Sequence, residues 1–65
     1  MSFSSARIAA GFTQTEAARR LEVNQSTVSY WESGKKFPRG PMLAKAADLY
    51  GCTVDELLGR APAGA

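Results

Sequence analysis

Helix start and stop signals punctuate the 65-residue chain from end to end and divide it into short segments. Between these signals, apolar residues recur at the three- and four-residue spacing of an amphipathic helix, and no alternating β-strand pattern competes with it. Glycines that favour helix C-termini close the segments at Gly11, Gly34, Gly51 and Gly59. The sequence therefore predicts an all-α, compact bundle of five short helices.

The first three predicted helices have recognisable limits. The first spans roughly residues 3–10. The second begins after Thr13, because Thr13 and Glu16 have the spacing of a capping box. The third is expected to cover residues 25–33, with Asn24 as its N-cap.

A basic loop and two further helices are predicted in the second half of the chain. Residues 34–40 contain two glycines and Pro38, so they are expected to form the loop. Pro41 suits the first position of a fourth helix, and Thr53 with Glu56 forms a second capping box at the start of a fifth. The residues expected to face the core are Phe3, Ala6, Ala10, Ala17, Ala18, Leu21, Val28, Trp31, Leu43, Ala46, Ala47, Tyr50, Val54, Leu57 and Leu58.

Composition limits the size and the location of the protein. With 45% hydrophobic residues and no low-complexity segment, residues 1–59 are expected to form one domain, and residues 60–65 a flexible C-terminal tail. The single cysteine, Cys52, cannot form an intrachain disulfide, which agrees with a reducing compartment. No apolar run approaches the roughly 20 residues that cross a bilayer. We therefore expect a cytoplasmic protein with no membrane partner.

The residue types that catalysis needs are missing. Histidine is absent, which excludes a metal site of the usual Cys/His kind and histidine-based acid–base chemistry. There is no nucleophile paired with a base and no phosphate-binding loop. We therefore expect a protein that is not an enzyme and that takes no cofactor, no metal and no small-molecule ligand.

Positive charge is concentrated in the first two thirds of the chain. Residues 1–45 carry seven basic and three acidic groups, whereas residues 46–65 carry one basic and three acidic groups. This distribution suggests that one surface meets a polyanion while another faces water or a partner. Lys35, Lys36 and Arg39 directly follow the third predicted helix and are expected to flank a phosphate strand.

The second and third predicted helices are joined by only a few residues, so they must cross sharply. Ala18 is small enough to lie where the two backbones approach. The wedge between the helices is expected to be filled by Leu21, Val23, Val28 and Trp31. The free face of the third helix carries uncharged hydrogen-bonding side chains, namely Gln25, Ser26, Ser29 and Tyr30. The first carboxylate in the third predicted helix is Glu32. A polar face of this kind suits the major groove, because an earlier carboxylate would repel the phosphates.

In this order and spacing, the sequence resembles the phage repressor and Cro type of helix-turn-helix domain, also called Xre-like. The resemblance runs from about Arg7 to Gly59. It rests on Thr13, Gln14, Glu16, Ala18, Leu21, Val23, Val28, Ser29, Trp31, Glu32, Gly34, Lys35, Pro38, Leu43, Ala46, Ala47, Leu49, Val54, Leu57, Leu58 and Gly59. It implies a lambda-repressor-like bundle with the helix-turn-helix at the second and third helices. It also implies a homodimer on a two-fold symmetric double-stranded DNA operator, acting at the nucleoid as a transcriptional repressor.

The resemblance also suggests roles for single residues. The expected base contacts are Gln25, Ser26, Ser29 and Tyr30, although Tyr30 could instead stack on sugar and phosphate or lie against the helix. The expected phosphate contacts are Gln14, Thr27, Lys35, Lys36 and Arg39, with Gln14 helped by the helix dipole. Arg7 and Glu32 match a structural ion pair between the first and third helices. Arg19 and Arg20 either contact phosphate or face solvent.

Two positions depart from the family pattern. Glu22 stands in the turn where many members have glycine. In left-handed geometry this residue costs roughly 1 kcal/mol, and a different turn would shift the third helix. Ala17 replaces a usual leucine, so Trp31 or Phe37 is expected to fill the space.

The fold also permits a second class of function. An antitoxin or adaptor of this type binds mainly another protein, usually through an additional segment. Because only about six small residues follow Gly59, DNA is the expected main partner. Titration with duplex DNA, set against capture of proteins from a cell extract, discriminates between the two.

Overall fold

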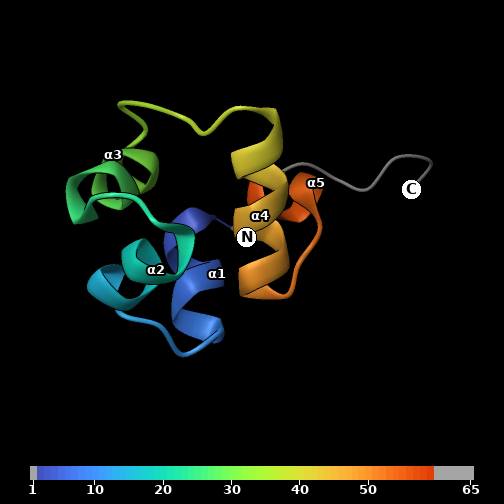
Figure 1. The fold of residues 1–65 in the computed structure, drawn as a ribbon. Helices are drawn as coiled ribbons and strands as arrows, with labels where there is room; N and C mark the ends of the chain where they lie inside the picture. The colour runs from blue at the N-terminus through green and yellow to red at the C-terminus, as the bar shows by residue number, and fades with distance from the viewer. Residues whose placement is uncertain (1, 60–65) are drawn as a thin grey trace.

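The computed structural model describes residues 2–59 and confirms the all-α prediction with five helices and, in this part of the chain, no strand. The helices are α1 (Phe3–Ala9), α2 (Gln14–Leu21), α3 (Gln25–Ser33), α4 (Gly40–Tyr50) and α5 (Val54–Leu57). In Figure 1, α1 lies between the α2–α3 pair and the α4–α5 pair, and it packs against both α3 and α4. Within the described residues, no helix is long and apolar enough to cross a membrane. The predicted tail at residues 60–65 lies outside them.

Two helices begin with the capping boxes that the sequence predicts. The Thr13 hydroxyl accepts a hydrogen bond from the Glu16 N–H at 3.1 Å, and the Glu16 carboxylate accepts one from the Thr13 N–H at 3.2 Å. Thr53 and Glu56 form the same reciprocal pair at the start of α5, with distances of 2.9 and 3.1 Å. These local bonds fix the starts of α2 and α5 at the predicted residues.

Two other predicted helix starts differ in detail. Helix α3 begins at Gln25 after the N-cap residue Asn24, as predicted, but the Asn24 side chain makes no capping hydrogen bond, and the Thr27 N–H bonds to the Asn24 carbonyl at 3.0 Å. The fourth helix begins at Gly40, so Pro41 is its second residue and not its first. Proline is tolerated there because N–H groups in the first turn have no partner within the helix.

All the buried side chains of the described residues were expected in the core. They are Phe3, Ala6, Ala17, Ala18, Leu21, Val28, Trp31, Ala46, Ala47, Tyr50 and Leu57. Four other expected core residues are only partly buried and pack against this cluster: Ala10, Leu43, Val54 and Leu58. The suggestion that Phe37 fills the space at Ala17 is wrong, because Phe37 is 61% exposed and lies against Phe3. Trp31 is buried and also packs against Phe3, with ring centres 6.1 Å apart.

Candidate nucleic-acid interface

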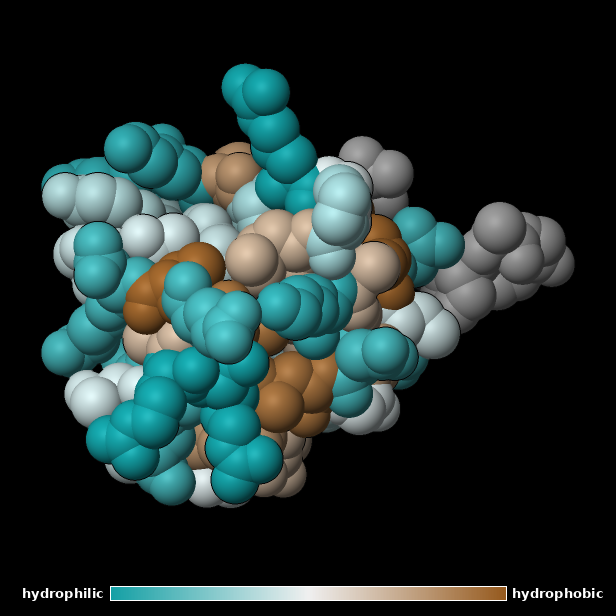
Figure 2. Space-filling model, viewed as in Figure 1, coloured by the Kyte–Doolittle hydropathy of each residue, from teal (hydrophilic) through white to brown (hydrophobic). Residues whose placement is uncertain are grey.

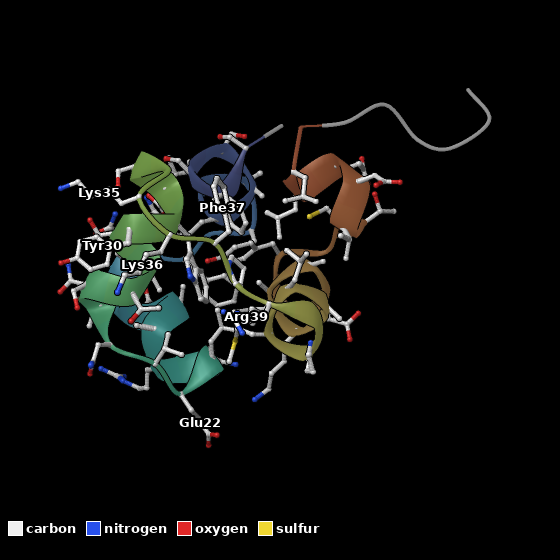
Figure 3. All side chains as sticks on the ribbon, turned by 90° about the horizontal axis from the view of Figure 1, so that it is seen from above. Glu22, Tyr30, Lys35, Lys36, Phe37 and Arg39 are labelled. Atoms are coloured by element: carbon white, nitrogen blue, oxygen red, sulfur yellow. The ribbon has the colours of Figure 1, made fainter. Side chains whose placement is uncertain are left out.

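Glu22, in the turn between α2 and α3, has a left-handed backbone conformation. This residue has φ of 59° and ψ of 42°, and its N–H bonds to the carbonyls of Ala18 and Arg19. The Val23 N–H also bonds to the Ala18 carbonyl, at 2.9 Å. The sequence allowed either a left-handed Glu22 or a different turn. The structure has the left-handed Glu22, at a cost of roughly 1 kcal/mol. The Glu22 side chain is exposed and points away from the body of the protein (Figure 3).

Helix α3 has one buried and one polar face. Val28 and Trp31 are 1% and 4% exposed and belong to the core. The side chains expected to read bases follow one another on the opposite face at helical spacing; they are Gln25, Ser26, Ser29 and Tyr30. All of them except the half-buried Ser29 are exposed. Figure 2 shows hydrophilic side chains predominating over α2, α3 and the loop after α3.

Arg7 and Glu32 form a nearly buried ion pair between α1 and α3. Nε of Arg7 donates to Oε2 of Glu32 at 2.6 Å, and Nη2 donates to Oε1 at 3.2 Å. Nη1 donates to the Phe12 carbonyl at 2.7 Å. The two side chains are only 13% and 10% exposed. Burial disfavours ionisation of Glu32, but hydrogen bonds from Arg7 and Gln14 outweigh it and hold the pKa of Glu32 below its ordinary value.

Gln14 connects this ion pair to the polar face of α3. Its Nε2 donates to Oε1 of Glu32 at 3.0 Å, and its Oε1 accepts a long hydrogen bond from Nε2 of Gln25 at 3.4 Å. A chain of hydrogen bonds thus runs from α1 to the first residue of α3 and restrains the Gln25 amide. Sequence reasoning missed both bonds of Gln14, because its partners are 18 and 11 residues away and no spacing pattern indicates them.

The loop after α3 begins as a compact basic unit around Tyr30. The Tyr30 carbonyl accepts hydrogen bonds from the N–H groups of Lys35 and Lys36, at 3.0 and 3.4 Å. Gly34, with φ of 81°, permits this tight helix end. The two Nζ atoms lie 5.8 and 5.4 Å from the centre of the Tyr30 ring (Figure 3). Neither ammonium is paired with a carboxylate within residues 2–59, so two positive charges border the polar face of α3.

The other predicted contact residues lie around this region. Thr27 and Gln14 are half-buried, and Arg39 is exposed at the start of α4, separate from the unit around Tyr30 (Figure 3). Arg19 and Arg20 are both exposed, and the Arg20 guanidinium lies over the Phe12 ring at 5.7 Å. Among the described residues, no group of three or more His, Cys, Asp or Glu side chains could hold a metal ion.

Helices α2 and α3, with a short turn between them and a free polar face on the second, define a helix-turn-helix domain. The sequence matches the helix-turn-helix family over residues 4–57. The chain therefore belongs to this family, in the Xre-like form that its sequence resembles.

Two curated relatives share this domain. The HTH-type transcriptional regulator ImmR of Bacillus subtilis (strain 168) is 38% identical over 55 residues, which cover 85% of this chain and 43% of the relative. The HTH-type transcriptional activator BcrR of Enterococcus faecalis is 36% identical over 52 residues, which cover 80% of this chain and 26% of the relative. The chain thus spans less than half the length of each of these relatives. No solved structure matches the sequence significantly.

Proposed function

We propose that this domain binds double-stranded DNA in a sequence-dependent manner and thereby regulates transcription, with α3 in the major groove. The observation that carries the proposal is the polar face of α3, where uncharged hydrogen-bonding side chains are exposed and two unpaired lysines stand at one end. The major groove admits a helix and presents donors and acceptors to such side chains. The phosphates on either side attract the lysines.

Gln25 is the best candidate for reading a base. A glutamine amide presents a donor and an acceptor side by side, which match N7 and N6 of adenine. The hydrogen bond from Gln25 to Gln14 restrains this amide before DNA arrives, so less side-chain freedom is lost on binding. Ser26 and Ser29 complete the reading face.

Phosphate contacts are proposed on both sides of this face. They involve Gln14, Thr27, Lys35, Lys36 and Arg39. Gln14 is the first residue of α2, where the helix dipole favours an anion. We assign Tyr30 to the ordering of Lys35 and Lys36, because its ring and its carbonyl both hold the segment that carries them.

We further propose that two copies bind a two-fold symmetric operator, since one recognition helix covers only a few base pairs. Two-fold symmetry would place the half-sites about 34 Å apart. The resemblance to phage repressors supports repression at the nucleoid, in the cytoplasm. BcrR is named an activator, so a reporter gene placed behind the operator decides between the two directions.

Selection from a pool of random duplexes tests this function. We expect the enriched sequences to contain two related half-sites and to bind at least about 10³-fold more tightly than scrambled duplexes at physiological salt. Equal affinity for enriched and scrambled duplexes would contradict the proposal. Capture of one defined protein from an extract, together with no DNA preference, would favour the adaptor function.

A further inference from the structure

The hydrogen bonds that lead from Glu32 to Gln25 have a direction that chemistry imposes. An ionised carboxylate only accepts hydrogen bonds, so Gln14 must turn its NH₂ group toward Glu32. The carbonyl oxygen of Gln14 then faces Gln25, which must answer with its own NH₂ group. Reversal of either amide would place two acceptors against each other. Glu32 therefore sets the orientation of both glutamine amides.

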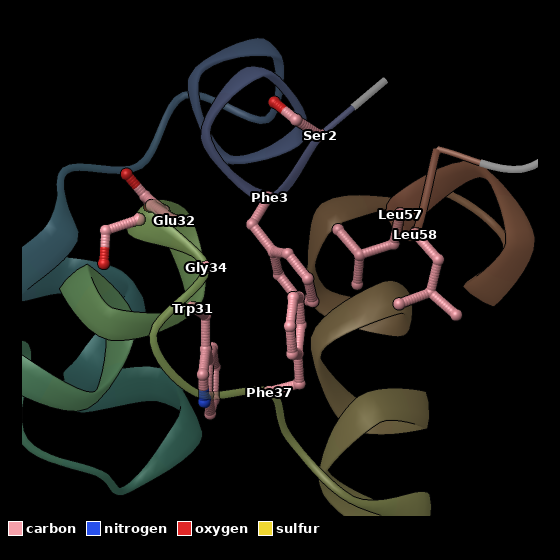
Figure 4. Close-up of a pocket in the computed structure, with 9 residues that line it drawn as sticks. Ser2, Phe3, Trp31, Glu32, Gly34, Phe37, Leu57 and Leu58 are labelled. Carbon is pink, nitrogen blue, oxygen red and sulfur yellow. The ribbon is translucent and has the colours of Figure 1, made fainter.

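Glu32 is a fixed starting point for this chain of bonds. It lies in the last turn of α3, where it also borders an open depression of the surface (Figure 4). Its side chain is nevertheless only 10% exposed, and Arg7 bonds both of its oxygens. Burial raises the pKa of this carboxyl, but the bonds from Arg7 and Gln14 outweigh it and keep the pKa below its ordinary value. The first acceptor of the chain thus stays ionised and in place at neutral pH.

Both glutamines keep groups for DNA after these bonds are made. The NH₂ group of an amide carries two N–H donors. Gln14 uses one of them for Glu32, and its second N–H remains for the proposed phosphate contact. Gln25 uses one N–H for Gln14, so its carbonyl oxygen and its second N–H remain for a base. The reading face therefore offers one acceptor and one donor at Gln25.

We propose that Glu32, acting through Gln14, is a positioning residue that makes Gln25 select adenine and reject guanine. The proposal rests on the DNA-binding function proposed above. Adenine presents an acceptor at N7 beside a donor at N6, which fit the two groups that Gln25 has free. Guanine presents acceptors at both N7 and O6. A Gln25 amide held by Gln14 turns its oxygen toward O6, and these two acceptors are then left unpaired against each other.

A glutamine without this restraint would discriminate less between the two purines. The terminal torsion of a glutamine side chain is broad, so a free amide turns its NH₂ group toward both guanine acceptors at little cost. In this protein the same rotation breaks the bond from Gln25 to Gln14. At 3.4 Å this bond is long, so we expect it to set a preference between the bases and not an absolute choice.

The first test compares two duplexes: the selected operator, and the same operator with guanine in place of the adenine that Gln25 reads. That position is the one at which Gln25→Ala loses discrimination. The wild-type chain should prefer adenine by about 5- to 150-fold. Glu32→Gln offers Gln14 either end of an amide and should lose most of this ratio. Glu22→Gln is the matched control, because it removes one carboxylate at an exposed position in the turn, and it should keep the wild-type ratio.

A second variant reverses the direction of the chain. Gln14→Lys still donates to Glu32 but offers no acceptor, so Gln25 must turn its oxygen toward the new ammonium and its NH₂ group toward the base. The preference should then move from adenine to guanine, which neither lower stability nor a changed phosphate contact would produce. Thr15→Lys adds the same charge at the next, exposed residue of α2 and leaves Gln14 in place, so it should keep the preference for adenine.

The possible failures can be told apart. Gln14→Lys with the wild-type preference for adenine overturns the proposal, even where helical circular dichroism shows that Glu32→Gln has unfolded. A folded Glu32→Gln chain that keeps the wild-type ratio also overturns it, and so does a wild-type preference for guanine at this position. If the wild-type chain binds the operator and a fully scrambled duplex equally, the proposed reading function itself has failed.

Discussion

Removal of the Arg7 guanidinium tests whether the ion pair between α1 and α3 holds the fold together. Arg7→Ala deletes two hydrogen bonds to Glu32 and one to the Phe12 carbonyl. It also leaves a carboxylate that is only 10% exposed without its cation. Stranding one partner of a buried pair costs about 3–5 kcal/mol. Because both groups keep a small exposure, the expected loss in the free energy of unfolding is about 3 kcal/mol.

This loss is large compared with the stability of so short a chain. At roughly 0.05–0.15 kcal/mol per residue, a domain of this size is stable by about 3–10 kcal/mol. Each 1 kcal/mol shifts the melting temperature of a small domain by about 4–8 °C, so Arg7→Ala should lower it by at least about 12 °C. The double variant Arg7→Met with Glu32→Leu should recover much of the loss, because no charge is then left unpaired.

Thermal and urea unfolding, followed by Trp31 fluorescence and by helical circular dichroism, measures these effects. Arg7→Lys is the matched control: it keeps the charge but not the two-pronged geometry, and should fall between the wild type and Arg7→Ala. An Arg7→Ala variant that melts with the wild type but binds DNA more weakly would refute the reasoning and assign Arg7 to a phosphate contact.

Four further variants test the acid response, the turn and the basic unit. Because the pKa of Glu32 is lowered in the folded chain, its contribution to stability is complete above the ordinary value of 4.5 and is lost as the pH falls through the lower folded value. Glu32→Gln should therefore flatten the acid side of the stability profile in urea unfolding, and an unchanged acid side would count against the ion pair. Glu22→Gly relieves the left-handed strain and should raise the free energy of unfolding by up to about 1 kcal/mol, whereas a loss of stability would show that the turn is not strained. Tyr30→Phe should keep DNA affinity and salt dependence, while Tyr30→Leu should weaken binding to matched and scrambled duplexes alike; lost selectivity in Tyr30→Phe would instead make the hydroxyl a base reader.

The features that sequence predicted best depend on residues close together in the chain. The capping boxes at Thr13 and Thr53 act over three residues, and the apolar stripes repeat within one or two turns. Asn24 shows the limit of such patterns: it is the N-cap residue, as predicted, but its side-chain oxygen and its backbone carbonyl are two possible acceptors for the Thr27 N–H, and the carbonyl binds it. Only the folded backbone decides which of them binds.

Features that depend on how helices cross could not be derived from spacing. The Arg7–Glu32 pair was expected from a family resemblance and not from periodicity. The bridge from Glu32 through Gln14 to Gln25 joins α3 to α2, and no local pattern specifies how these two helices are placed. The predicted place of Phe37 was wrong for the same reason, since its ring lies against Phe3 and stays 61% exposed.

The most direct test of the central claim compares Gln25→Ala with Lys35→Ala on matched and scrambled duplexes at several salt concentrations. If α3 reads the major groove, Gln25→Ala should lose about 1–3 kcal/mol on the matched duplex and little on the scrambled one. Lys35→Ala should weaken both duplexes alike and lower the slope of log affinity against log salt by about one. Equal losses on both duplexes for Gln25→Ala would contradict the account, because the polar face of α3 would then not be the surface that chooses the sequence.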